Sequence, residues 1–441
     1  MIRHCLPLLL LSAISLGTQA ERPLAEALPL EPLQVLEEQQ ASGSGNAEQL
    51  FASHRQAVFR IDVIHPATGR KSSLGTGFSI GQPNLLASNF HVIAEHVHRP
   101  EQTRLEWQAD DGRRGPLQLV AIDVVHDLAL LRAAEDLAPP LATAALPAKG
   151  ASLFAMGHPL GLELAIVSGT ANGLLEKSLF DKIHFSGNLN PGMSGGPALD
   201  TLGRVVGINV ATAGEAVSFL VPAAYLDQLL ASARSRQFAV DPDFHLTIRD
   251  QLVTHNDSLL SEIRQHQADQ QSLGKAQVPG ELSPRIDCWG EVERADSRKP
   301  IRTLASICQG DDQIHISDEL GAGLISYEFF WLDSEKLHGR DFARLYQRNF
   351  ISRFPGNAGR DDVGNFGCSV RFVDIAGKAF KANVCARPYR RYPGLIDFLA
   401  VLALVGESHE GMIITLDLGG VTLPQGMSLL ANLLERVTWP S

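Results

Sequence analysis

Residues 190–197 place a serine inside a glycine-rich turn, NPGMSGGP. Glycine on both sides of Ser194 allows a tight turn at low steric cost. Such a turn exposes the serine hydroxyl and lets the backbone N–H groups of Gly192 and Ser194 converge on the oxyanion that develops during acyl transfer. The segment therefore predicts a nucleophilic serine beside a backbone oxyanion hole.

A serine hydroxyl is a poor nucleophile at neutral pH unless a base removes its proton and a third group orients that base. Two upstream residues fit these roles. His91 lies in ASNFHVI, which we expect at the end of a strand, and Asp127 lies in HDLALL, where a carboxylate opens an apolar strand. We predict that His91 is the general base and then the acid, that Asp127 fixes its tautomer, and that Ser194 attacks the scissile carbonyl.

Other histidines and one other aspartate compete for these roles. His96 and His98 follow the predicted base closely, but neither shares its sequence context. His126 reads as a loop residue at the entrance of the strand, so we assign no catalytic role to any of the three. We prefer Asp127 to Asp123 as the orienting acid because Leu-Ala-Leu-Leu follows Asp127 directly.

The serine turn also has two other interpretations. An ordinary glycine-rich turn between strands would have the same composition, and short motifs do produce false positives. Residues 192–196 also match the Gly-x-Ser-x-Gly elbow of α/β-hydrolases, in which a helix follows the serine and the histidine comes last. Here Pro197 and a strand-like VVGINV follow, and the chain order is His, Asp, Ser.

Short strand-like runs between Gly, Pro, Asn and Asp turns recur from residue 58 to residue 221. Many short strands at close spacing predict a sandwich or a pair of barrels. Apolar residues at helical spacing over 223–233 predict a helix that closes this domain. We therefore expect the chemistry within residues 46–235, followed by a partly helical linker at 236–280 and a smaller α+β domain at 281–441.

The N-terminus has the pattern of a secretory signal peptide: an apolar run over residues 6–16, then small or polar residues up to Ala20. We expect cleavage after Ala20, so that residues 1–20 are removed. Residues 21–45 are rich in Pro, Glu, Gln, Ser and Gly and predict a mobile segment. We expect no membrane span after signal removal, since a span needs about 20 apolar residues.

The three predicted catalytic segments resemble the trypsin-like serine proteases, and the bacterial HtrA/Deg branch in particular. His91 matches the histidine of that branch's Thr-Asn-x-His-Val pattern, with Ser88 in place of Thr. Asp127 matches the aspartate of Asp-Leu-Ala-Val-Leu, and Ser194 matches the serine of Asn-Pro-Gly-Asn-Ser-Gly-Gly. The resemblance implies an all-β, double β-barrel protease domain.

Two further segments extend this resemblance. Residues 155–161, AMGHPLG, resemble the branch's Ala-Ile-Gly-Asn-Pro-Phe-Gly, and residues 207–209 resemble its Gly-Ile-Asn strand. The resemblance covers roughly residues 46–232. If the alignment holds, the specificity pocket is lined by Asn188, Val210, Thr212 and Ser218, none of them acidic, which implies a preference for small or medium apolar side chains.

The chain departs from the family pattern in two places. Met193 stands where the branch usually has Asn and where zymogen-activated trypsins have Asp, so no carboxylate can clamp a newly cut N-terminus. Downstream of residue 235 we find no Gly-Leu-Gly signature of a PDZ domain, although HtrA proteases usually carry one. The C-terminal domain resembles no family that we can name.

Four cysteines remain after signal removal, and all lie in the C-terminal half: Cys288, Cys308, Cys368 and Cys385. No CxxC pair is present, so we expect no zinc site. An even number of cysteines in an exported chain favours disulfides. Of the three possible connectivities we prefer the sequence-local one, Cys288 with Cys308 and Cys368 with Cys385.

The composition is that of a globular protein, with 44% hydrophobic residues and a formal net charge of −11. Without a dense run of Lys and Arg we expect no nucleic-acid or anionic-membrane partner. The triad needs no metal or organic cofactor. By resemblance, the protein would be an exported endopeptidase that acts on unfolded or damaged envelope proteins in the periplasm.

Several questions stay open from the sequence. A secreted protease would carry the same signal peptide as a periplasmic one, and the oligomeric state has no sequence signal. A different class of function is a binding or scaffold protein that kept the protease fold and lost turnover. The sequence features that favour such a non-catalytic protein are the unusual Met193 and the large unassigned C-terminal domain.

Overall fold

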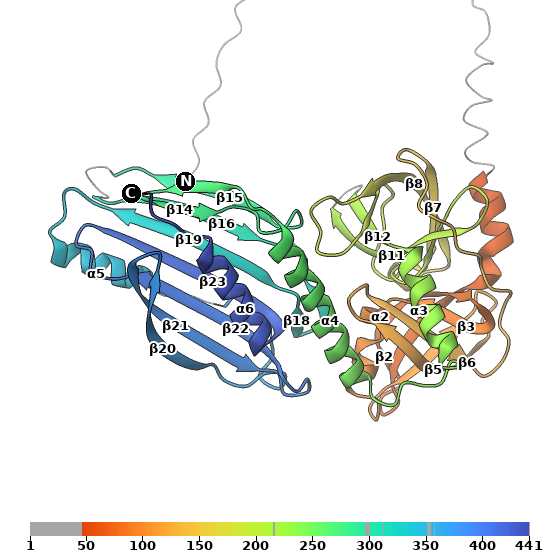
Figure 1. The fold of residues 1–441 in the computed structure, drawn as a ribbon. Coiled ribbons are helices and arrows are strands. Elements are labelled where there is room, and N and C mark those ends of the chain that lie inside the picture. Colours follow the sequence, from red (N-terminus) through yellow and green to blue (C-terminus); the bar gives the residue numbers. More distant parts are fainter. Residues whose placement is uncertain are drawn as a thin grey trace, which may run out of the picture. The chain divides into compact units, whose positions relative to one another are not determined.

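Two closed antiparallel barrels make up the part of the chain that contains the predicted triad (Figure 1). The computed structural model describes residues 46–214, 217–295, 300–310, 312–350, 354–356 and 358–440. The predicted signal peptide and the segment 21–45 lie outside the described residues. The predicted double β-barrel is confirmed.

The first barrel has the strand order β1-β2-β3-β6-β5-β4. Successive side chains of each strand point to opposite faces of the barrel wall. In β1, Phe59, Ile61 and Val63 point into a core that also holds Trp107. A short 3₁₀ helix precedes this barrel and helix α2 follows its third strand. The bounds are η1 Arg55–Ala57, β1 Val58–His65, β2 Arg70–Ile80, β3 Gln82–Ser88, α2 Phe90–His98, β4 Arg104–Gln108, β5 Arg114–Asp123 and β6 Leu128–Ala133.

The second barrel has the order β10-β11-β12-β9-β8-β7, and helix α3 follows its last strand. Its core includes Phe185, Leu220 and Met193. The bounds are β7 Ser152–Gly157, η2 Pro159–Gly161, β8 Ala165–Leu174, β9 Ile183–Phe185, β10 Pro197–Leu199, β11 Val205–Gly214, β12 Val217–Pro222 and α3 Ala223–Ser235.

Helix α4 (Phe244–Gln265) starts at Asp243, whose side chain accepts hydrogen bonds from the backbone of His245 and Leu246. This capping satisfies N–H groups that have no partner inside the helix. The helix is amphipathic. Its first half contributes Ile248 to the core of the first barrel, and its second half contributes Ile263 to the core of the C-terminal sheet.

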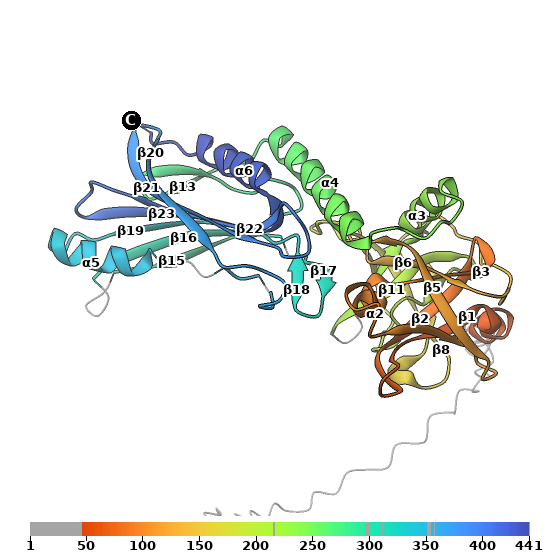
Figure 2. The same ribbon diagram turned by 90° about the horizontal axis from the view of Figure 1, so that it is seen from below.

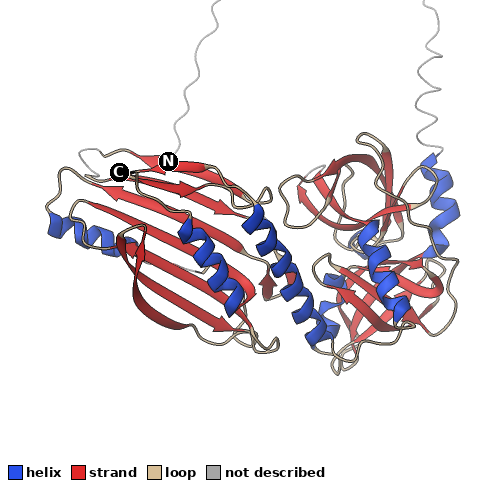
Figure 3. Cartoon of the chain, viewed as in Figure 1, coloured by secondary structure: helices blue, strands red, loops and turns tan. Residues whose placement is uncertain are grey.

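The C-terminal region is built on one seven-stranded antiparallel sheet in the order β15-β16-β19-β23-β22-β21-β20 (Figure 3). A capping box formed by Thr422 and Gln425 starts its last helix, α6. The bounds are β13 Gln270–Leu273, β14 Ala276–Pro279, β15 Asp287–Glu293, β16 Arg302–Gln309, β17 Ile314–Ser317, β18 Leu320–Ala322, β19 Ile325–Asp333, α5 Gly339–Asn349, β20 Gly367–Ile375, β21 Lys378–Pro388, β22 Leu395–Leu404, β23 Glu410–Thr422 and α6 Leu423–Glu435.

Both faces of this sheet carry apolar residues, because helices cover both (Figure 2). On β23, Ile414 faces the cluster that contains residues of α4 and α6, and its neighbour Ile413 faces the cluster that contains Phe342 of α5. Strands β17 and β18 form a separate two-stranded hairpin. This hairpin contributes Ile316 and Leu320 to the core of the first barrel.

Two disulfides join Cys288 to Cys308 and Cys368 to Cys385. Each pair lies directly opposite on neighbouring strands, β15 with β16 and β20 with β21. Since β15 and β20 are the two outermost strands of the sheet, each bond attaches an edge strand to its inner neighbour.

No helix among the described residues is long and apolar enough to cross a membrane.

Candidate active site

Asp127 holds His91 through two hydrogen bonds. One carboxylate oxygen accepts the backbone N–H of His91 at 2.8 Å, and the other lies 2.6 Å from the ring atom Nδ1. A carboxylate on Nδ1 leaves Nε2 as the nitrogen that is free to accept a proton. The geometry is that of an imidazole oriented for general base catalysis.

The two segments that carry this pair are bound to each other by their backbones as well. The carbonyl oxygen of Asp127 accepts hydrogen bonds from the backbone N–H of Phe90 and from the side-chain amide of Asn89. Asp127 itself has a φ of 55°, a left-handed conformation that non-glycine residues seldom adopt. His91 lies in the first turn of α2 rather than at the end of a strand, since β3 ends at Ser88.

Ser194 lies in a turn whose glycines adopt conformations that other residues avoid. Gly192 has a φ of 94° and Gly195 a φ of 84°. A Cβ atom on Gly192 would lie 2.4 Å from the carbonyl oxygen of His158, and one on Gly195 would lie 2.2 Å from that of Thr76. The turn therefore requires glycine at both positions for conformation and for space.

The N–H groups of Gly192 and Ser194 donate no hydrogen bond to any described residue. The carbonyl groups of the same two peptide units are bound on the opposite side. The Pro191 oxygen accepts from Leu160 N–H at 2.6 Å, and the Met193 oxygen accepts from Gly196 N–H at 3.1 Å. Because the carbonyl and N–H of a trans peptide point in opposite directions, these bonds aim the two free N–H groups.

Thr76 fixes the same turn from the first barrel. Its hydroxyl donates to the Gly192 carbonyl at 2.7 Å, and its backbone N–H donates to the Ser194 carbonyl at 2.8 Å. The backbone N–H of His158 in turn donates to the Thr76 hydroxyl oxygen at 3.0 Å. The sequence analysis gave this threonine no role.

The Ser194 hydroxyl donates to the carbonyl oxygen of Val210 at 2.8 Å. Within the described residues it forms no hydrogen bond with His91. The Asp-His half of the predicted triad is assembled, whereas the serine hydroxyl is turned toward β11.

Met193 is buried in the apolar core of the second barrel. Its Cα lies 2.8 Å from the position that a Cβ on Gly157 would occupy, so the turn packs tightly against the end of β7. This arrangement gives Met193 a structural role beneath the turn.

The four residues predicted to line a specificity pocket lie on the segments around β11 and β12. Val210 and Thr212 are on β11, and Thr212 pairs with Ser218 of β12. The Ser218 hydroxyl is buried and accepts the backbone N–H of Leu189, the residue after Asn188. Ser218 therefore holds the segment that leads into the turn of Ser194.

The competing histidines are engaged elsewhere. His96 contacts Thr103, and His98 contacts the carbonyl oxygen of Ile316 at 2.7 Å. His126 forms a second His-Asp pair, 2.7 Å from Asp123, and its ring stacks on Tyr225 with centroids 3.6 Å apart.

Burial and charge act against each other on His91. Burial alone would lower its pKa, but the charge and hydrogen bond of Asp127, helped by the charge of Asp318, raise the pKa of His91 above its ordinary value. The protonated, imidazolium form of His91 is therefore stabilised. Asp318 belongs to the turn of the β17–β18 hairpin, and sequence reasoning assigned it no role.

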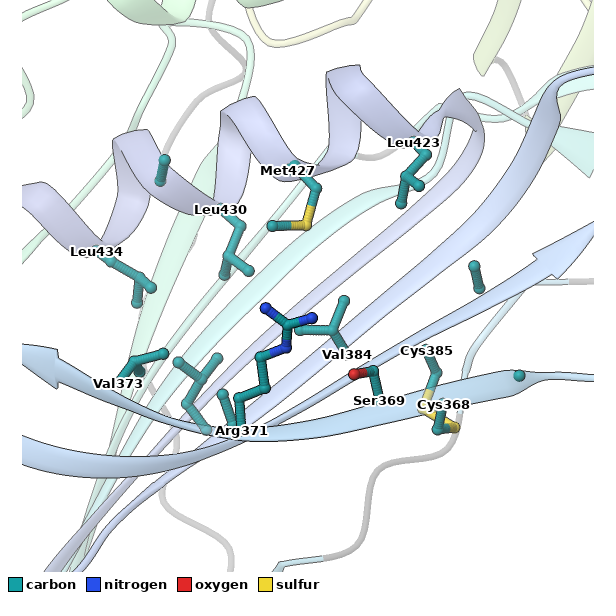
Figure 4. Close-up of a pocket in the computed structure, with 15 residues that line it drawn as sticks. Cys368, Ser369, Arg371, Val373, Val384, Cys385, Leu423, Met427, Leu430 and Leu434 are labelled. Atoms are coloured by element: carbon teal, nitrogen blue, oxygen red, sulfur yellow. A yellow bond between two sulfur atoms is a disulfide. The ribbon is translucent and has the colours of Figure 1, made fainter.

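A large apolar recess lies away from these residues, on the C-terminal sheet. It has a volume of about 840 Å³ and is bounded by strands β20 and β21 and helix α6 (Figure 4). Its lining is apolar apart from Ser369 and Arg371. No predicted catalytic residue lines it. Among the described residues no group of His, Cys, Asp or Glu side chains could hold a metal ion.

Comparison with known proteins agrees with the fold. Residues 75–208 match the family model described as the trypsin-like peptidase domain. The chain is 27% identical to mitochondrial serine protease HTRA2 of Bos taurus, over 47% of this chain and 48% of that protein. It is 28% identical to chloroplastic Protease Do-like 5 of Arabidopsis thaliana, over 46% of this chain and 72% of that protein.

A solved structure titled as that of Deg5 aligns with 25% identity and a TM-score of 0.38, over 43% of this chain and 95% of that one. The chain spans about half the length of the HTRA2 relative. The double barrel contains the segment that matches the trypsin-like peptidase domain. Its relatives are serine proteases of the HtrA and Do-like type, as the sequence resemblance predicted.

Proposed function

We propose that the protein is a serine endopeptidase in which His91, Asp127 and Ser194 form the catalytic triad. The observation that carries this proposal is the pair of hydrogen bonds by which the Asp127 carboxylate holds the backbone N–H and the Nδ1 atom of His91. In the proposed mechanism the Ser194 hydroxyl turns from Val210 toward Nε2 of His91, transfers its proton and attacks the scissile carbonyl. His91 then donates the proton to the leaving amine.

The N–H groups of Gly192 and Ser194 would bind the oxyanion. Two observations support this role. The carbonyl groups of the same two peptide units are hydrogen-bonded, which fixes the orientation of both N–H groups, and neither N–H has a partner among the described residues. Donors that are oriented before the reaction cost no reorganisation during it. Asn188, Val210, Thr212 and Ser218 would shape the pocket for the substrate side chain.

We further propose that the protein is exported, through the signal pattern of residues 1–20, and that it cleaves unfolded or damaged polypeptides of the cell envelope. The two disulfides support an oxidising compartment. Fractionation of cells into periplasm and medium would distinguish a periplasmic protein from a secreted one.

The proposed activity is tested with a fluorophosphonate probe and with casein. The wild-type chain should react with the probe and cleave casein, and Ser194→Ala should lose both activities while it keeps its melting temperature. A Ser194→Ala variant that folds and still cleaves casein at the wild-type rate would overturn the proposal.

A second candidate is a protease-fold scaffold without turnover. The observation in its favour is the Ser194 hydroxyl, which is bound to Val210 instead of His91. Absence of probe labelling in a folded wild-type chain would favour this candidate.

A further inference from the structure

The β17–β18 hairpin of the C-terminal region packs on helix α2, which carries His91 in its first turn. Ile316 and Leu320 of the hairpin belong to the same apolar core as Ile93 and Val97 of this helix. All four side chains are buried. The contact therefore resembles the packing inside a domain more than a loose touch between two surfaces.

Polar contacts hold the far end of α2 to the same region. His98 bonds the carbonyl oxygen of Ile316 through Nε2 at 2.7 Å, and its own carbonyl oxygen accepts a hydrogen bond from Arg391 at 3.0 Å. Because hydrogen bonds are directional, these two contacts fix a register that apolar packing alone leaves open. The position of the hairpin along α2 is thus specified.

At the other end of α2 the hairpin reaches the base of the triad. The ring of His315 stands edge-on to the ring of His91, with centroids 6.1 Å apart and an interplanar angle of 80°. The His91 side chain still keeps 30% of its surface exposed. His315 therefore covers one side of the imidazole and leaves another side open, as a wall of a cleft would.

His315 has an unused hydrogen-bonding atom at this place. Its Nε2 is buried and has no partner among the described residues. A buried polar atom without a partner is costly, so a group that supplies one is bound favourably. A polypeptide lying beside His91 carries such groups in its backbone N–H and carbonyl, and it would meet Nε2 after a rotation of the His315 ring, since this atom is covered in the structure.

The titratable groups around His315 are His91, Asp127 and Asp318. Burial chiefly lowers the pKa of His315; His91 lowers it further, and the two aspartates oppose the change. A neutral ring in this position adds no positive charge beside the imidazolium that His91 becomes during catalysis.

We propose that the β17–β18 hairpin forms a wall of the substrate cleft, and that His315 is a specificity-determining residue that contacts the polypeptide segment lying beside His91. This inference rests on the proposed peptidase function. It makes the C-terminal region, to which the sequence assigned no role, part of the active site.

The test uses the full chain with His315→Phe, which keeps a ring but removes the nitrogens, and His315→Gln, which keeps hydrogen bonding without the ring. His338→Ala, at an exposed histidine before α5, is the matched control. Fluorophosphonate labelling is measured first, and kcat and KM are then measured on peptides that differ at single positions on either side of the cleaved bond.

We expect all four proteins to be labelled. The two His315 variants should change the ratio of kcat/KM between peptides by about tenfold or more at one substrate position, the size expected when a pocket contact is lost. The His338→Ala variant should keep the wild-type ratios. A purely structural role would scale all peptides alike, so variants that fold and retain the wild-type ratios would overturn the inference.

Failure of the proposed function gives a different result. In that case the wild-type chain itself would show neither labelling nor peptide cleavage. If His315→Phe failed to fold, His315→Gln would still decide the question. Unchanged ratios of kcat/KM between peptides in His315→Gln are enough to contradict a contact between His315 and the substrate.

Discussion

The Ser194 hydroxyl and the Val210 carbonyl are joined by a 2.8 Å hydrogen bond, which occupies the proton that His91 would have to accept. A rotation of the serine side chain is therefore the first event required of this site. This rotation breaks one hydrogen bond between two uncharged groups, the Ser194 hydroxyl and the Val210 carbonyl, and such a bond contributes about 1 kcal/mol net. Its loss is a small barrier compared with the chemistry that follows.

The pH dependence of activity should reveal the pairing of His91 with Asp127. The base must be neutral, and because Asp127 raises the pKa of His91, the rising limb of kcat/KM should lie above the ordinary imidazole value of about 6.5. In Asp127→Asn the raising charge is lost while burial remains, so the limb should move to lower pH. The rate should also fall by roughly 10⁴-fold. If the rising limb of kcat/KM lies at the same pH in Asp127→Asn as in the wild type, the pairing of His91 with Asp127 is contradicted.

Substitution of Gly192 should damage catalysis more than stability. The Gly192→Ala side chain would meet the carbonyl oxygen of His158 and distort the peptide that carries one oxyanion donor. We expect a loss of about 10²- to 10³-fold in kcat, the usual cost of one donor. Gly112→Ala is the matched control, since Gly112 also has a positive φ but has open space around it. Equal losses of kcat in the two variants would count against an oxyanion hole at Gly192.

Acid should destabilise the fold below about pH 6.5. Burial lowers the pKa values of His98, His158 and His255 to about 4. Between pH 6.5 and about pH 4 these histidines are protonated in the unfolded chain but stay neutral in the folded chain. The free energy of unfolding therefore falls as the pH falls. Chemical denaturation at a series of pH values measures this slope. His158→Asn removes one of the three groups and should make the slope shallower; an unchanged slope would show that His158 does not contribute.

Reduction should loosen the edges of the C-terminal sheet. The two bonds close loops with sequence separations of 20 and 17 residues, for which loop closure predicts about 3 kcal/mol each. Hydrogen exchange on the reduced protein should therefore speed up first in β15 and β20. The two barrels contain no cysteine, so their exchange should change little. Uniform acceleration across the chain would mean that the barrels and the sheet unfold as one unit.

The local parts of the site are readable from the sequence because their chemistry depends on residue type at short range. Gly192 and Gly195 are required by positive φ angles, and Asp127 is marked by a charge next to an apolar strand. These constraints lie within a few residues of each functional group. Short strands with closely spaced turns predicted a sandwich or a pair of barrels, the resemblance to trypsin-like proteases implied the double barrel, and the double barrel is confirmed.

Other features depend on which surfaces meet in space, and only the tertiary structure decided them. The bond between Ser194 and Val210 exists because β11 runs past the nucleophile turn. His98 and Ile316 are 218 positions apart, and the hairpin that brings His315 to His91 docks through apolar packing. Such packing is non-directional and has no sequence signature at either end. For that reason the sequence and its family resemblance determined the triad candidates and the barrels, and the tertiary structure decided which distant residue stands beside His91.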